Sequence, residues 1–227
     1  MNFKTTTIIG LLILLCSSTT LFAKQNQSDG FLELGLTTNK YSYGDSIEND
    51  GYTDVLGIEL NYMNRIAKNI VSGFRTNYSF GTLNDSLGNE YDMKAIDANL
   101  IMKYELVNTK AMQFGPIVSL GWDYATIEDL EYNLIFSGVG VFANYNISKS
   151  ISIGASYEYR FVLSDDISNG DEKLNINDVE ETYFSIPLSL QMNKTTWLVL
   201  EYSNKSTTLD DSELNNNSFA AKLHWKW

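Results

Sequence analysis

The residues of this chain that are best suited to chemistry are charged side chains of both signs, which recur at alternate positions within apolar stretches. In that spacing each charge shares a face with glycine, serine or asparagine, and the opposite face is apolar. Acids and bases on one such face can pair across a narrow interior. The nine residues that we predict to form these ion pairs are Glu33, Glu59, Arg75, Asp97, Lys103, Asp123, Glu158, Arg160 and Lys222.

A second candidate is a dense acidic run between residues 165 and 181. Carboxylates are the hard oxygen ligands that divalent cations prefer, and such cations also bridge lipopolysaccharide phosphates. A calcium-loop alignment that starts at Asp165 places Gly170 and Asp171 correctly, but Ile167 and Ile176 occupy positions that require oxygen ligands. We therefore interpret the run as a solvated acidic loop, and we predict neither a metal site nor a cofactor.

The elements that must position these residues are strands. From residue 31 onward apolar and polar residues alternate with a period of two, and no segment of comparable length has a helical period. The pattern predicts an all-β protein with ten strands, at residues 31–39, 55–64, 70–81, 93–106, 113–124, 135–145, 151–162, 182–192, 196–204 and 218–227.

The connections between these strands alternate in length. Segments 40–54, 82–92, 125–134, 163–181 and 205–217 are long, whereas 65–69, 107–112, 146–150 and 193–195 are tight. The long segments hold 20 of the 28 acidic residues. This asymmetry is typical of a transmembrane up-and-down antiparallel barrel, which has long loops outside and short periplasmic turns.

Two prolines count against this assignment, because proline removes a hydrogen bond from a sheet that has no free edge. Pro116 falls near a turn, and Pro187 is best explained by a bulge. An eight-stranded barrel, which would omit a weak pair of strands, therefore stays open as an alternative.

The first 23 residues have the pattern of a secretory signal peptide, which leaves residues 24–227 as the barrel. Lys4 supplies the charge, Ile8 to Leu15 form the apolar core, and Ala23 offers a cleavage site. The only cysteine, Cys16, lies in this segment, so we expect a mature protein without thiols. Cleavage takes the formal charge from −12 to −13, which argues against a nucleic-acid partner.

Charges and aromatic residues indicate which face meets the lipid. Tyrosine and tryptophan concentrate toward the strand ends, as in the girdles of membrane barrels. On the lipid face Arg75 alone would cost about 2–4 kcal/mol near the midplane. The charged face is therefore predicted to line the lumen, and the solvent-facing charges of a soluble barrel are the less favoured reading.

The last strand carries an apolar residue at every second position and ends on an aromatic carboxy terminus, with Phe219, Ala221, Leu223, Trp225 and Trp227. This pattern resembles the assembly signal of outer-membrane barrels, which the barrel-assembly machinery recognises. As an architecture, the chain resembles the family of small OmpA-like outer-membrane β-barrel domains. It departs from their commonest layout by two extra strands. The resemblance implies a location in the bacterial outer membrane.

The only histidine decides against enzymes built on such barrels. The ten-stranded omptin proteases use aspartates with a histidine at the outer rim, and lipid A deacylases use a serine–histidine pair. His224 lies three residues from the chain end, about 10 Å along a strand, near the periplasmic rim. We predict a hydrogen-bonding lumen residue, no catalytic residues and no enzyme activity.

The size of the lumen limits the functions that the barrel can have. Eight strands leave room only for side chains and large channels need about sixteen, so ten strands predict a mostly filled lumen. We expect a structural or surface-interaction role through acidic extracellular loops. A narrow, porin-like passive channel is the alternative, and a protease or lipid-modifying enzyme is a third possibility. Expected partners are outer-membrane lipid, lipopolysaccharide and the assembly machinery.

Overall fold

The computed structural model describes residues 30–43, 53–84, 90–128, 130–169, 172–174, 179–209 and 212–227. The predicted signal peptide, Cys16 and parts of the predicted long loops lie outside these residues. Among the described residues, no helix is long and apolar enough to span a membrane.

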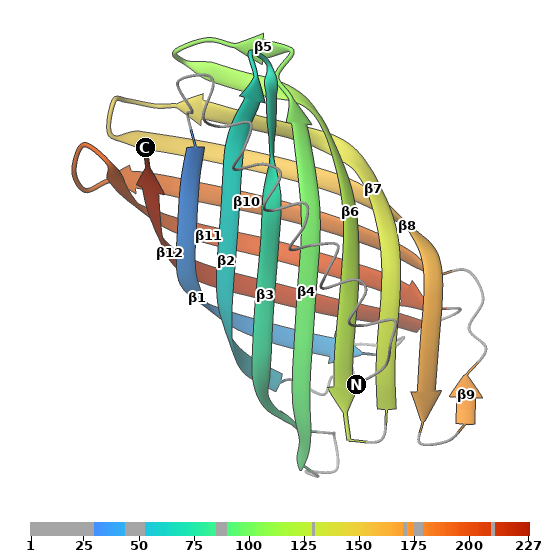
Figure 1. Ribbon diagram of the computed structural model, residues 1–227. Coiled ribbons are helices and arrows are strands. Elements are labelled where there is room, and N and C mark those ends of the chain that lie inside the picture. The colour runs from blue at the N-terminus through green and yellow to red at the C-terminus, as the bar shows by residue number, and fades with distance from the viewer. Residues whose placement is uncertain are drawn as a thin grey trace.

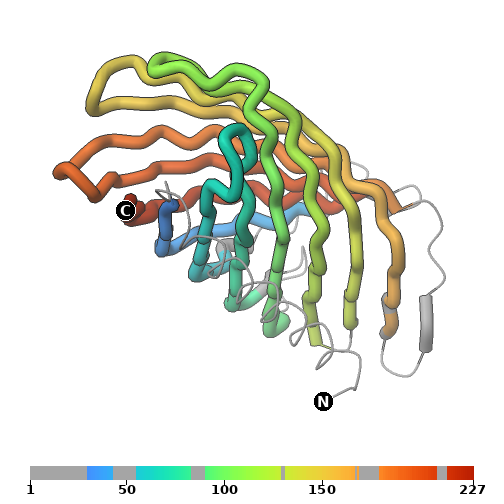
Figure 2. Tube along the Cα trace, turned by 45° about the horizontal axis from the view of Figure 1, so that its top comes forward, coloured from blue at the N-terminus to red at the C-terminus, as the bar shows by residue number. Residues whose placement is uncertain are grey.

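Ten long antiparallel strands form a closed barrel, which confirms the predicted strand number and leaves no support for eight. The last strand pairs with the first along its whole length, and the two lie side by side in Figure 2. The ten strands are β1 (Gly30–Tyr43), β2 (Thr53–Ala67), β3 (Ile70–Asn84), β4 (Glu90–Tyr104), β6 (Met112–Ile127), β7 (Leu130–Asn146), β8 (Ile151–Asn169), β10 (Glu180–Gln191), β11 (Thr196–Leu209) and β12 (Ser212–Lys226).

Two short strands lie outside the closed sheet. β5 (Val107–Asn108) pairs with β6 inside the connection predicted as a tight turn, and β9 (Glu172–Leu174) pairs with the far end of β8. Figure 1 shows β9 projecting beyond one end of the barrel. We call this the hairpin end of the barrel. The opposite end is the short-turn end, where strands are connected by residues 68–69, 147–150 and 192–195.

The strands are staggered around the barrel. Following the paired residues from Phe31 through every strand returns to β1 at Tyr43, twelve residues further along. Such a stagger tilts the strands against the barrel axis and fixes the lumen width. A given height of the lumen therefore collects residues from very different places in the chain.

Four of the five predicted long loops are mostly strand, and two of them almost entirely so. Residues 125–134 and 205–217 were expected to connect strands, but β6 and β7 turn at Glu128, whose φ is 50°, and β11 and β12 continue to Leu209 and Ser212. Hydroxyl, amide and charged side chains predominate in 205–217, whereas 125–134 mixes acidic with apolar residues. Both segments lack the apolar alternation of lipid-facing strands, so the sequence pattern did not reveal them.

The two prolines are accommodated differently. Pro116 is exposed on the outer wall near the start of β6. At Pro187 the pairing of β10 with β8 is interrupted between Ser185 and Leu188, yet the register is the same on both sides, so the predicted bulge is wrong. Gly154 makes the gap possible, because a Cβ there would lie 3.0 Å from Pro187 Cγ.

Large apolar side chains cover the outer wall, and charged side chains are buried in the interior. Leu36, 69% exposed, and Phe219, 62% exposed, belong to a belt of large apolar residues on the outer wall. Arg160, 0% exposed, and Lys222, 1% exposed, lie in the interior. Lipid is the surrounding that makes such an arrangement stable, and closure of the sheet satisfies the backbone within it.

Candidate functional site

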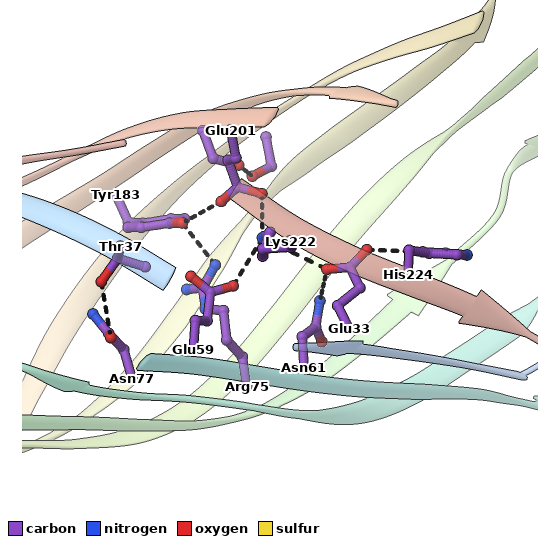
Figure 3. Close-up of polar contacts among 12 residues, drawn as sticks. Glu33, Thr37, Glu59, Asn61, Arg75, Asn77, Tyr183, Glu201, Lys222 and His224 are labelled. Carbon is purple, nitrogen blue, oxygen red and sulfur yellow. Dashed lines mark hydrogen bonds and ion pairs between the residues drawn. The ribbon is translucent and has the colours of Figure 1, made fainter. Parts of the chain in front are cut away.

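The lumen contains a polar network built around two lysines. Lys222 on β12 is surrounded by three glutamates (Figure 3). Its Nζ lies 2.8 Å from Glu59 Oε1, 2.8 Å from Glu201 Oε2 and 3.5 Å from Glu33 Oε2. An ammonium group has three N–H donors and no acceptor, so three carboxylates match its capacity. Asn61 also donates to Glu33 at 2.9 Å.

Lys205 on β11 forms a second cluster of the same kind. Its Nζ lies 2.6 Å from Asp123 Oδ2, 3.7 Å from Asp97 Oδ2 and 3.9 Å from Glu181 Oε2. Asp97 and Asp123 are direct cross-strand partners on β4 and β6. Two neighbouring carboxylates repel each other, and the ammonium group between them compensates for that repulsion.

An arginine and a tyrosine connect the two lysine clusters. Arg160 donates to Glu181 at 2.6 Å and lies 3.9 Å from Glu158. Two guanidinium groups lie over the Tyr183 ring, with Arg75 4.3 Å and Arg160 4.7 Å from its centroid. Arg75 also donates to the Tyr183 hydroxyl at 2.7 Å, and that hydroxyl lies 3.4 Å from Glu201. The network is therefore continuous from one lysine cluster to the other.

Two of these contacts cross the full width of the barrel. Arg75 on β3 and Tyr183 on β10 belong to strands that lie five positions apart in either direction around the sheet. Lys205 on β11 and Asp97 on β4 have the same relation. Figure 3 shows Tyr183 and Arg75 reaching toward each other from separate walls. We call these two contacts the cross-lumen braces.

Apolar side chains fill the lumen on either side of this network. Met63, Ile101, Ile117 and Phe142 cluster near the short-turn end, with Phe31 packed against them. A second set lies near the hairpin end, consisting of Tyr41, Val55 and Met93 with Ala95, Ile127 and Leu214 beside it. Ions that crossed the barrel along its axis would meet both apolar layers and the braces.

His224 lies at the short-turn end of the lumen. Its Nδ1 is 2.9 Å from Glu33 Oε1, and its ring stacks on Phe31 with 4.5 Å between centroids. At the same end Arg65 pairs with Glu105 through two hydrogen bonds of 2.7 and 2.9 Å. Within the described residues, no group of three histidine, cysteine, aspartate or glutamate side chains is arranged to hold a metal ion.

Eight of the nine residues predicted to line the lumen in ion pairs lie in this network. Glu33, Glu59 and Lys222 meet in one cluster, Asp97 and Asp123 in the other, and Arg75, Glu158 and Arg160 lie between them. Lys103 also faces the lumen, but its contact is the Phe142 ring, 5.2 Å from Nζ. Among the described residues it has no carboxylate partner.

The nine residues predicted to form ion pairs leave out Glu201, and the sequence pattern missed three further members of the network. Lys205 and Glu181 had been assigned to solvated loops, and Tyr183 had been given no role. The two-residue alternation already placed both charged residues on the lumen face. Lys205 follows the lumen residue Ser203 by two positions, and Glu181 precedes Tyr183 by two. Continuing the two-residue period past the last large apolar residue would have found both.

The residues of the predicted assembly signal lie on the outside. Phe219, Leu223 and Trp227 are exposed, and the Trp227 ring packs against Tyr62 with 6.0 Å between centroids. The Trp227 backbone N–H donates to Gly30 O at 3.3 Å. The chain end is thus held at the seam where the barrel closes.

A closed antiparallel sheet with an apolar exterior and a charged, buried interior defines a transmembrane β-barrel of the bacterial outer membrane. Solved structures of this class share the fold. The outer membrane protease OmpT from Escherichia coli matches with a TM-score of 0.57 and 12% identity, over 88% of this chain and 96% of that one. The translocator domain of the autotransporter NalP from Neisseria meningitidis matches with a TM-score of 0.52 and 7% identity, over 99% and 98%.

These similarities concern the fold alone. No family model and no curated protein matches the sequence. The proposed kinship with small OmpA-like barrels is therefore not shown by any sequence match.

Proposed function

We propose that this protein is a closed, non-conducting outer-membrane barrel that acts through its outer end, in a structural or surface-interaction role. The observation that carries the proposal is the pair of cross-lumen braces. A passive channel needs a continuous aqueous path, and side chains that join opposite walls at two places interrupt it. The small OmpA-like barrels, which the sequence resembles in architecture, are the group we propose as its relatives.

The energetics of the network support a permanent closure. Breaking a buried ion pair by removing one partner costs about 3–5 kcal/mol, because the other charge stays buried without compensation. Arg160 and Lys222 are both almost completely buried, and each is held by more than one carboxylate. Opening the lumen would break several such pairs at once.

The surface role rests on the hairpin end, which extends away from the membrane belt and is acidic. Asp165 and Asp166 on β8 and Glu131 on β7 are exposed there. Clustered charges of one sign accelerate encounters with oppositely charged partners, and salt weakens the effect. We therefore propose a cationic surface or polypeptide as the partner of this end.

Single-channel recording from the purified protein in a planar bilayer tests the closed lumen. We expect no steady openings under conditions in which a general porin conducts. Steady openings would instead support the alternative, a narrow passive channel for small solutes.

An enzyme is the less favoured proposal, although OmpT shares the fold. A protease site of the kind expected on these barrels needs a histidine at the outer rim. His224 is held against Glu33 and Phe31 at the opposite end. Hydrolysis of peptides or of lipid A by the purified barrel, abolished by replacing an acidic residue of the hairpin end, would overturn our preference.

A further inference from the structure

The outer wall of the barrel contains a groove of about 280 Å³ that the lumen network does not explain. It crosses β2, β3, β4 and β6, which are consecutive neighbours in the sheet and stand side by side in Figure 1. Its sides are large apolar residues that face away from the lumen, namely Tyr62, Phe74, Leu100, Met102, Val118 and Leu120.

The groove exists because one small residue, Ser72, lies between these large ones. Ser72 on β3 is the cross-strand neighbour of Met102 and lines the groove where the other outward-facing positions carry bulky side chains. Gly73 contributes only backbone to the floor, because its own position faces Met63 in the lumen.

The position of the groove identifies the membrane leaflet. Ser72 is the third residue of β3 and Met102 is two residues from the end of β4, so both lie within about 10 Å of the short-turn end at normal strand rise. Short turns face the periplasm in outer-membrane barrels. The surrounding leaflet is then the inner one, which consists of phospholipid.

We propose that this groove binds one acyl chain of a phospholipid from the periplasmic leaflet. The groove is continuous with the lipid-facing belt, since Met102, Val118 and Leu120 are each more than two-fifths exposed at its edge. An acyl chain in the groove buries apolar surface on several sides, whereas a chain on a flat wall contacts it on one.

Aromatic rings mark where the lipid headgroup would lie. Tyr62 stacks on Phe74 with 5.7 Å between centroids and on Trp227 with 6.0 Å. Tyrosine and tryptophan favour the level of the headgroups. The chain would therefore extend from this aromatic edge toward Leu120, deeper in the membrane.

Native mass spectrometry of the purified barrel, with a phospholipid and lipid A each added in turn, tests the proposal. We expect one phospholipid to remain bound under activation that removes all other lipid. Ser72→Phe places a ring in the groove and should lower this fraction about tenfold, as expected when most of the apolar contact is lost. Ala155→Phe adds the same ring on the exposed outer face of β8 and should leave the fraction unchanged.

Heat-dependent gel migration establishes that each variant is folded, and Ser72→Leu replaces Ser72→Phe if the ring prevents folding. Equal retention by the wild type and the Ser72 variant would overturn the proposal. So would the absence of a retained phospholipid, or preferential retention of lipid A. None of these outcomes depends on whether the lumen conducts.

Discussion

At the scale of single residues, the two lumen lysines determine how the interior is organised. Each places one ammonium group among three carboxylates contributed by three strands. Lysine suits this role because its compact charge and rotating donors serve several acceptors in different directions. Without the cation, buried carboxylates would repel each other.

Replacing Lys222 with Met should lower the free energy of unfolding by about 3–5 kcal/mol, because three buried glutamates lose their counter-charge. The matched control is Lys103→Met, which removes a lysine of the same lumen whose contact is the Phe142 ring. That variant should cost about 1 kcal/mol or less. Equilibrium unfolding in denaturant, with the barrel in lipid vesicles, measures both. Similar losses in the two variants would contradict the role assigned to Lys222.

The sequence predicted these charges better than it predicted their partners. Alternation alone placed eight network members on the lumen face, because a charge among apolar residues stands out. It could not pair Arg75 with Tyr183 or Lys205 with Asp97, since those contacts depend on the stagger of strands around the barrel. Stagger is set by the registers of all ten pairings, which no single strand encodes.

At the scale of elements, the extended strands at the hairpin end separate two kinds of acidic residue. Glu181, in the run predicted to be a solvated loop, is fully buried and bound by Arg160. Asp165 and Asp166 of the same run are exposed. The first therefore contributes to stability, and the others lie on the surface of the hairpin end.

Deleting residues 165–178 should remove surface charge and spare the barrel. The deletion leaves Ser164 and Val179 to connect β8 and β10, a short loop that a hairpin accommodates. Binding of a fluorescent oligolysine peptide to cells that display the variant should weaken and lose its salt dependence. Thermal unfolding should change little.

Glu181→Ala is the complementary variant, because it keeps the exposed acids and leaves Arg160 without its nearest carboxylate. It should retain oligolysine binding and lose about 3–5 kcal/mol of stability. The account of the hairpin end fails if the deletion unfolds the barrel or leaves oligolysine binding intact.

At the scale of the whole molecule, the sequence was sufficient for the architecture. The strand number and the closure of the barrel follow from ten alternating segments. The apolar exterior and charged interior follow from the cost of placing charges in lipid. The lengths of the strands did not follow, because β6, β7, β8, β11 and β12 extend past their predicted ends on residues without the apolar alternation of lipid-facing strands. Pro187 was misread as a bulge, since the sequence does not show that Gly154 makes room for it.

The central claim, a lumen closed by side chains, is tested most directly by solvent access to its middle. Ser185 is 6% exposed and hydrogen-bonds Ser156 inside the barrel, and a cysteine at this position has nearly the same shape. In a background with Cys16→Ser, Ser185→Cys should not react with a charged, water-soluble thiol reagent, whereas Asp165→Cys at the hairpin end should react at once. Modification of both cysteines at similar rates would show an open aqueous path and contradict the closed barrel.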